Sequence, residues 1–361
     1  MKARDSAQPM QSRAEAGLSR KPVLEVRNLQ LGVSSRRGRA LAVDGVGFTI
    51  SPGQTLGLIG ESGSGKSLTG LALIGLLPRP AVTLVGGEII FKGEDLARKS
   101  FSQMRDYRGR HISMVLQDPL SALNPVLSIE DQICEALKLH TGLQGAALRE
   151  RALELLKMMR IPAAEERLKA YPHQLSGGMR QRVVGAIAIA GGPEILIADE
   201  PTTALDVTVQ AAYLDLLREI QQRTGLGMLF ITHDFSVVGD ICHDVAVMYG
   251  GRIVEKGKTE DIFDRPSHPY TKALLRSVPD VTKSPKRLAS IAGSPPSVFG
   301  MSSGCRFHPR CWLHERLGRP ERCVTHVPPL EEKLPNHESA CHFHDEALKE
   351  EIDVMADLPT D

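Results

Sequence analysis

Residues 60–67 read Gly60-Glu61-Ser62-Gly63-Ser64-Gly65-Lys66-Ser67 and fit the pattern G-x-x-x-x-G-K-[ST]. The apolar run TLGLI at 55–59 predicts a strand buried on both faces, and residues 67–77 predict a helix that ends before Pro78. Glycines in such a turn let backbone N–H groups converge on phosphate oxygens, and the helix N-terminus adds a favourable dipole. We therefore expect Lys66 to bridge the β- and γ-phosphates of a nucleotide and Ser67 to ligate Mg²⁺. An ordinary Gly/Ser-rich turn with an exposed lysine would not need the flanking strand and helix.

A second carboxylate pair follows another buried strand. Residues 195–200 read ILIADE, so Asp199 and Glu200 emerge where an apolar run ends. In a parallel sheet this edge is also the edge of the phosphate loop. Asp199 is expected to hold Mg²⁺ through water, and Glu200 to orient and polarise an attacking water. Two carboxylates that merely end a strand are common in isolation, but not beside a phosphate loop in the same sheet.

Two further strands are expected to end in polar side chains at the same edge. His233 follows the run 227–231 in the string ITHD, and we expect it to contact the γ-phosphate. A satisfied surface histidine is the alternative. Gln117 ends the expected strand 111–116 and could contact Mg²⁺ or the attacking water. Gln117 also opens a helical stretch, which makes it a candidate coupling point.

A second candidate anion site is Ser176-Gly177-Gly178, within LSGGM and before an expected helix at 179–190. Small residues and free N–H groups at a helix N-terminus suit an anion. Over 100 residues separate this turn from residues 60–67. A head-to-tail pair of chains, each offering this turn to the other's nucleotide, would use both. A glycine-capped loop without a ligand is the alternative.

Composition and element order give the architecture. The chain has 361 residues and 44 basic against 43 acidic side chains, so its net charge of +1 gives no reason to expect nucleic-acid binding. No apolar run is long enough to cross a bilayer, and residues 1–22 lack an apolar export signal and are expected to form a disordered tail in a cytosolic protein. Strands alternate with helices over 23–260, which predicts a parallel sheet covered on both faces, with a helical insertion at about 120–182. Residues 261–361 are rich in proline and predict an irregular extension.

The motifs GESGSGKS, VLQDP, LSGGMRQR, ILIADEP, TTALD and ITHD, in this order, resemble the ATP-binding subunit of an ABC transporter over roughly residues 23–260. The resemblance implies an α/β P-loop NTPase fold with a RecA-like core, an antiparallel β subdomain and an inserted α-helical subdomain. It also implies a dimer in which Ser176, Gly177 and Gly178 act on the partner's ATP. Ala204-Leu205-Asp206 matches the loop that crosses the interface between the two subunits.

The strings LSALNP, HPYTKALL, IAGSPPS and GCRFHPRC resemble the oligopeptide/dipeptide (and nickel) permease ATPases of bacteria. The resemblance implies an ATPase that drives uptake of di- or oligopeptides through two membrane permease subunits fed by an extracytoplasmic binding protein. The second ATPase subunit is expected to be a different chain, and the location the cytoplasmic face of the inner membrane. Import of nickel or another small solute is an alternative. A soluble ABC ATPase acting on nucleic acid or ribosomes is another, but the chain lacks the coiled-coil insertion or duplicated domain typical of those.

One departure from the family concerns the base of the nucleotide. The family usually has an aromatic residue before the phosphate loop that stacks on adenine, whereas this chain has Arg39-Ala40-Leu41-Ala42 there. A guanidinium group can also stack on a ring, so Arg36, Arg37 or Arg39 could replace the aromatic residue.

Four of the six cysteines fall in the extension, as Cys305, Cys311, Cys323 and Cys341 with spacing C-x5-C-x11-C-x17-C. Disulfides are disfavoured in the cytosol. Zinc would suit such ligands but usually shows a closer pair, and a [4Fe–4S] cluster normally shows a tighter run. The spacing alone therefore does not choose among these. In some members of the peptide-permease family matching cysteines hold a [4Fe–4S] cluster, so the resemblance implies a cluster with a structural role.

Overall fold

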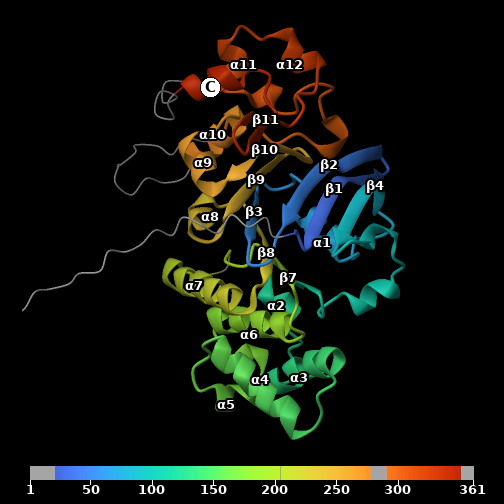
Figure 1. The fold of residues 1–361 in the computed structure, drawn as a ribbon, viewed down its shortest axis with the longest axis vertical. Helices are drawn as coiled ribbons and strands as arrows, with labels where there is room; N and C mark the ends of the chain where they lie inside the picture. Colours follow the sequence, from blue (N-terminus) through green and yellow to red (C-terminus); the bar gives the residue numbers. More distant parts are fainter. Residues whose placement is uncertain (1–20, 204, 278–290, 351–361) are drawn as a thin grey trace, which may run out of the picture.

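The computed structural model describes residues 21–203, 205–277 and 291–350. Residues 1–20 of the expected tail, and Ala204 of the expected interface loop, lie outside the described residues. Figure 1 shows an elongated molecule with helices α3, α4 and α5 at one end and α11 and α12 at the other. The phosphate-loop helix α1 lies between them, beside the blue sheet formed by β1, β2 and β4.

The main sheet has eight strands in the order β11-β12-β10-β9-β3-β8-β7-β6. The central strands run parallel, which confirms the predicted parallel sheet: β3 (Thr55–Ile59), β6 (Ile112–Val115), β7 (Ile195–Asp199), β8 (Gly227–Thr232) and β9 (Asp244–Tyr249). Strand β10 (Arg252–Lys258) runs antiparallel to β9. Every residue of β3, β7 and β8 is buried, as their unbroken apolar runs predict.

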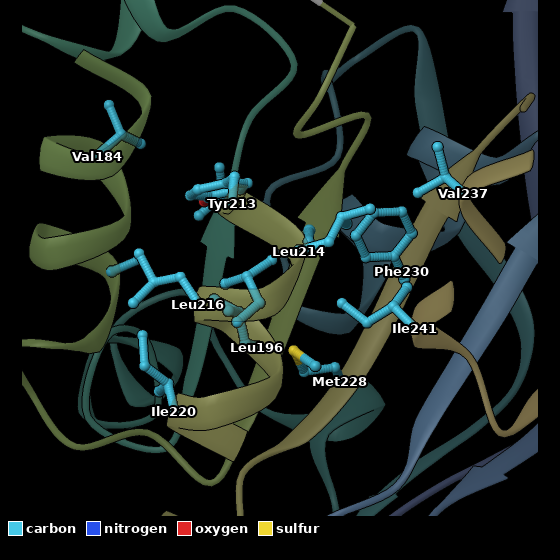
Figure 2. Packing of buried hydrophobic residues seen from close by; sticks show 14 of the residues in the cluster. Val184, Leu196, Tyr213, Leu214, Leu216, Ile220, Met228, Phe230, Val237 and Ile241 are labelled. Carbon is cyan, nitrogen blue, oxygen red and sulfur yellow. The ribbon is translucent and has the colours of Figure 1, made fainter. Parts of the chain in front are cut away.

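Successive side chains of each central strand point to opposite faces of the sheet, so the apolar core is divided between the two faces. In β8, Met228 and Phe230 belong to one apolar cluster, and Leu229 and Ile231 belong to the other. Helices α6 (Gly177–Ile189), α7 (Val207–Thr224) and α8 (Phe235–Ile241) contribute to the first cluster. Figure 2 shows Tyr213, Leu216 and Ile220 of α7 between the sheet and α6. Packing on both faces holds the strands in place, and therefore also the polar residues at their carboxyl ends.

Helix α1 (Lys66–Leu73) covers the opposite face and is shorter than predicted. It ends before Gly75, whose φ of 64° is left-handed, and not at Pro78. The N–H groups of Gly75 and Leu76 donate to the carbonyls of Ala72 and Leu71, at 3.0 and 2.9 Å. This is the glycine-ended arrangement that commonly stops a helix.

The second sheet is antiparallel, with strand order β2-β1-β4-β5. Its strands are β1 (Leu24–Ser35), β2 (Gly38–Ile50), β4 (Val82–Phe91) and β5 (Glu94–Asp95). Its apolar side chains join those of α1 in the second cluster of the core. This arrangement agrees with the expected antiparallel β subdomain.

The insertion predicted at about 120–182 is helical. It contains α2 (Pro119–Ala122), α3 (Ile129–Thr141), α4 (Ala146–Met158) and α5 (Ala164–Leu168), and it leads into α6. Ser128 and Asp131 form a capping box at the start of α3, and Gly142 with φ 72° ends it. A break at Gly142 therefore separates the first two long helices of the insertion.

The C-terminal region is more regular than predicted, and two of its strands extend the main sheet. Its elements are α9 (Thr259–Asp264), α10 (Pro269–Arg276), α11 (Trp312–Arg316), α12 (Glu321–Thr325), β11 (Glu331–Leu334), β12 (His337–Ser339) and α13 (His344–Lys349). Strand β12 pairs with β10, and β11 pairs with β12. In the described parts of the chain, no helix is both long enough and apolar enough to traverse a lipid bilayer.

Candidate nucleotide-binding site

The loop at 60–65 joins β3 to α1 and is shaped by glycines that approach the neighbouring backbone. A Cβ atom on Gly60 would lie 2.1 Å from the carbonyl oxygen of Met248. Gly65, with φ 104°, caps α1, and a Cβ there would lie 2.9 Å from the carbonyl oxygen of Ala42. Only glycine fits these two positions without a shift of the main chain. The loop therefore presents its backbone at the start of α1.

Lys66 is turned into this loop. Its Nζ donates to the carbonyl oxygens of Gly60 and Glu61 at 2.6 and 2.9 Å, and its side chain is almost fully buried. Burial lowers the pKa of Lys66, and the negative charges of Glu200 and Asp199 oppose this effect. An ammonium group held by carbonyls at the start of α1 is placed to receive phosphate oxygens.

Ser67 and Asp199 meet at the end of β7. The Ser67 hydroxyl donates to Oδ1 of Asp199 at 3.1 Å, and Asp199 is only 5% exposed. Burial raises the pKa of Asp199, while the hydrogen bond from Ser67 opposes the rise. Two adjacent hard oxygen donors are the ligand type that Mg²⁺ prefers.

Glu200 is the centre of a hydrogen-bonded group. Its Oε2 accepts from Gln117 Nε2 at 2.8 Å and from the Thr203 hydroxyl at 3.1 Å, and its Oε1 lies 3.0 Å from His233 Nδ1. The backbone of Glu200 has φ 46°, a left-handed conformation that is uncommon for a residue with a side chain. The carboxylate is thus fixed by neighbours from β6 and β8, the two strands beside its own.

The structure brings together the predicted residues from four separate parts of the sequence. Asp199 is the last residue of β7 and Glu200 follows it, whereas Gln117 and His233 follow β6 and β8, and Lys66 and Ser67 come after the loop that follows β3. All four strands are parallel, so their carboxyl ends share one edge. Thr203 was not predicted, although its place three residues after Glu200 was a usable signal.

Ser176 caps α6, which begins at Gly177, two residues before the predicted start, and the role of this turn at an anion stays a prediction. Its hydroxyl accepts from the Met179 N–H at 3.3 Å, and both Ser176 and Gly177 are exposed. Gly178 lies against Val209 at the start of α7. Among the described residues, no hydrogen bond joins this turn to residues 60–67 of the same chain. Arg36, Arg37 and Arg39 are exposed around the β1–β2 turn, and their role at a base stays a prediction.

Glu61 has partners that sequence reasoning missed. Its N–H donates to the Tyr270 hydroxyl at 2.9 Å, and its carboxylate accepts from both terminal nitrogens of Arg310 at 2.7 and 3.0 Å. The partners are 209 and 249 positions away in the sequence, so no local signal could have found them. The phosphate loop is therefore in direct contact with the C-terminal region.

The four cysteines of the extension line one pocket of about 20 Å³, measured as space for the centre of a water-sized sphere. Burial raises the pKa of Cys311 to about 12 and that of Cys323 to about 11, and the neighbouring Cys305 adds to both shifts. Nδ1 of His314, which also lines the pocket, is buried and has no hydrogen-bond partner among the residues that the structure describes. Within the part of the chain that the structure describes, no three His, Cys, Asp or Glu side chains are grouped closely enough to hold a metal ion.

The comparisons with known proteins agree with this arrangement. The sequence model of the family described as ABC transporter matches residues 43–203, and that of the oligopeptide/dipeptide transporter C-terminal region matches residues 254–316. The chain is 45% identical over 340 residues to a probable peptide ABC transporter ATP-binding protein of Sinorhizobium fredii, covering 94% of this chain and 99% of that one. It is 48% identical over 289 residues to the dipeptide transport ATP-binding protein DppD of Bacillus subtilis, covering 80% and 86%.

A similar solved structure is a dimeric ATP-binding cassette in a post-hydrolysis state, bound to ADP and Pi. It is 26% identical with a TM-score of 0.59, and the match covers 65% of this chain and 98% of that one. The fold, the ordered motifs and these relatives together show that this chain is an ATP-hydrolysing member of the ABC transporter family of ATP-binding proteins, and that it carries the C-terminal region of the oligopeptide/dipeptide transporters.

Proposed function

We propose that the chain powers a bacterial importer of di- or oligopeptides by hydrolysing ATP at the edge formed by β3, β6, β7 and β8. The observation that carries the proposal is the group of Lys66, Ser67, Asp199 and Glu200 at this edge. Lys66 binds the β- and γ-phosphates together with the N–H groups of residues 60–67. Ser67, Asp199 and Gln117 would hold Mg²⁺, which would neutralise phosphate charge when bound.

Glu200 is the proposed general base. Its carboxylate lies between Gln117 and His233, so it can accept a proton from a water placed by the same two side chains. His233 is 55% exposed and is assigned to contact the γ-phosphate. The strained backbone of Glu200 is consistent with a residue held in place for chemistry.

We propose that a second ATPase subunit completes the nucleotide-binding site. Ser176, Gly177 and Gly178 would bind the partner's ATP, and the exposure of Ser176 and Gly177 in the single chain supports this role. The dimeric state of the similar cassette bound to ADP and Pi is consistent with it. ATP binding would then close the pair, because its γ-phosphate offers charge to both turns, and phosphate release would reopen it.

Relatives named as peptide import ATP-binding proteins support the rest of the proposed assembly. We place the ATPase domain at 23–260 and the C-terminal extension at 261–361. The chain would lie at the cytoplasmic face of the inner membrane, against two permease subunits fed by a peptide-binding protein. The second ATPase is proposed to be a different chain. The names of the relatives favour peptides over nickel, and they favour transport over action on nucleic acid or ribosomes.

The test is Glu200→Gln in the assembled complex. ATP turnover is expected to fall by about 10²- to 10⁴-fold, the contribution typical of a general base, while Mg·ATP still binds. Lys66→Ala is the paired variant and is expected to lose ATP binding itself. ATPase activity that survives Glu200→Gln at its original rate would remove Glu200 from the chemistry.

We further propose that Cys305, Cys311, Cys323 and Cys341 hold a [4Fe–4S] cluster. Zinc is the alternative occupant, and the described side chains include no group of three His, Cys, Asp or Glu placed to hold a metal ion of either kind. All four cysteines nevertheless line one pocket, as a multinuclear cluster bound by four thiolates requires. When bound, the cluster would tie together the segments that carry these four cysteines.

Iron, sulfide and zinc analysis of anaerobically purified protein tests this assignment. Stoichiometric iron and sulfide, together with a visible absorbance that dithionite bleaches, would support a cluster. Cys323→Ser should reduce the iron content, the sulfide content and the visible absorbance. Cys134→Ser is the matched control, because Cys134 lies on α3 in the helical insertion. A colourless protein with full zinc occupancy would contradict the proposal.

A further inference from the structure

Glu61 is the only carboxylate within residues 60–67, and it is held from outside that loop. Arg310 forks onto both carboxylate oxygens, and the Tyr270 hydroxyl accepts from the Glu61 N–H. Neither partner belongs to the nucleotide motifs. The loop that would bind phosphate is thus connected to residues that follow the last parallel strand.

Arg310 is itself firmly fixed. Its side chain is 6% exposed, its Nε donates to the carbonyl oxygen of Ala292 at 2.9 Å, and a terminal nitrogen lies 3.3 Å from the Tyr249 hydroxyl. Buried bidentate pairs of this kind have both stronger and more directional hydrogen bonds than exposed ion pairs. The two hydrogen bonds from Arg310 therefore fix the position of the Glu61 carboxylate as well as neutralising its charge.

Glu61 in turn positions the lysine. Its carbonyl oxygen accepts from Lys66 Nζ at 2.9 Å and from the Ser64 N–H at 3.2 Å. The peptide groups on both sides of this residue are thus hydrogen-bonded, one to Tyr270 and the other inside the loop. A shift of Glu61 would move the carbonyl that holds Lys66.

The charge of Glu61 matters as much as its place. A carboxylate beside a phosphate-binding loop repels the phosphates of ATP unless a cation neutralises it. Arg310 is that cation. Removal of Arg310 alone would leave a partly buried, unpaired negative charge next to the triphosphate.

We propose that Arg310 is a positioning residue for ATP binding: it neutralises and fixes Glu61, so that the C-terminal extension sets the ATP affinity of the phosphate loop. This inference rests on the proposed ATP site at residues 60–67. Arg310 acts on ATP binding through Glu61 and takes no part in the hydrolysis step at Glu200. Its loss should raise KM for ATP and leave kcat nearly unchanged.

The experiment compares Arg310→Gln, Glu61→Gln and the double variant in the full-length chain. Equilibrium binding of Mg·ATP is measured by calorimetry in the Glu200→Gln background, and KM and kcat are measured with Glu200 intact. Arg310→Gln is expected to raise Kd and KM about tenfold, with kcat within about threefold. Glu61→Gln should have a smaller effect, and the double variant should bind better than Arg310→Gln, because the unpaired charge is gone.

A purely structural role of Arg310 would not be rescued by Glu61→Gln, so a double variant as weak as Arg310→Gln overturns the proposal. So does an Arg310→Gln variant with unchanged Kd. Arg316→Gln is the matched control, because its ion pair with Glu350 lies elsewhere on the extension, and it should leave Kd unchanged. Should Arg310→Gln fail to fold, Arg310→Lys tests the fixing of Glu61, since lysine keeps the charge but loses the fork, and an unchanged Kd in that variant overturns the positioning role.

Failure of this inference can be told apart from failure of the ATP site. Lys66→Ala that still binds Mg·ATP with the parent's Kd would remove the ATP site and the inference together. Loss of binding in Lys66→Ala, with a normal Kd in Arg310→Gln, would remove only the role of Arg310.

Discussion

The parallel sheet and the C-terminal extension are stabilised by different interactions. In the sheet, β3, β7 and β8 are buried along their whole length between two large apolar clusters. The extension's separate cluster contains only Trp312, Leu313 and Ala347 as buried members. The extension also places Tyr270 and Phe307 in the first of the two large clusters. Polar contacts attach it as well, with Glu255 and Asp44 as acceptors in the ATPase domain.

Glu255 is the clearest of these attachments. It lies on β10 with no exposed surface, and its carboxylate accepts from the N–H and hydroxyl of Ser267, from the His268 N–H and from His337 Nε2. His337 belongs to β12, so this one side chain ties together three segments. The comparison teaches that the sheet should be sensitive to lost apolar volume, whereas the extension should be sensitive to lost hydrogen bonds.

The largest effect is expected from Phe230→Ala in β8. Phe230 is fully buried between the sheet and its helices, so the substitution leaves a cavity and should cost about 3–5 kcal/mol of unfolding free energy. Denaturant unfolding measures the change. Val207→Ala is the control, because Val207 is 80% exposed, and its cost should be small. A small cost for Phe230→Ala would mean that the sheet is not held by its apolar core.

A somewhat smaller and more local effect is expected from Glu255→Ala. It leaves buried donors of Ser267, His268 and His337 without their acceptor, which should cost about 3 kcal/mol. Hydrogen exchange followed by mass spectrometry should show faster exchange over 331–339 and unchanged protection in β7 and β8. Glu338→Ala, which removes a partly exposed pair with Lys256 on the same two strands, is the control. Uniformly faster exchange in both regions would contradict the distinction.

A third prediction concerns how the buried charge of Asp199 affects the stability of the nucleotide-free chain. Burial raises the pKa of Asp199, so its ionised form opposes folding at neutral pH and this penalty fades as pH falls through that pKa. Asp199→Asn should therefore stabilise the nucleotide-free chain by about 1 kcal/mol at pH 7.5, with a smaller gain at lower pH. Thermal unfolding across this pH range tests it. If the stability gained by Asp199→Asn grew as the pH fell, the result would contradict this prediction. Mg·ATP should strongly stabilise the unmodified chain but not the Asp199→Asn variant.

The smallest effect is expected from Arg319→Gln. Its ion pair with Glu315 is on the surface of the extension, with Arg319 72% exposed, so stability should change by less than about 0.5 kcal/mol. Thermal unfolding is again the measurement. A large loss here would show that exposed pairs, as well as buried ones, attach the extension.

The predictability of the two regions differs for a physical reason. The strands at 55–59, 195–199 and 227–232 are continuous apolar runs, and polar residues such as Glu200 and His233 directly follow them. Local patterns therefore predicted both the parallel sheet and the residues gathered at its edge. The end of α1 was missed because Gly75 stops the helix before the more obvious Pro78.

The extension was harder to predict, because its order depends on distant partners. Strand β11 reads EEKL and β12 reads HES, and neither has the apolar alternation that indicates a strand. They become strands by pairing beside β10. The contact between Arg310 and Glu61 is likewise invisible in a sequence that separates them by 249 positions.

The place of β12 beside β10 limits how the chain can be shortened. Backbone groups around Glu255 and Lys256 pair with Ser339 and Glu338, so a protein ended after Lys258 would leave β10 as an open edge of the main sheet. An uncovered edge strand is a template for pairing with other molecules. Truncation to the minimal ATPase domain would therefore favour aggregation, and insoluble protein from such a truncation would say nothing about whether the ATPase domain itself is intact.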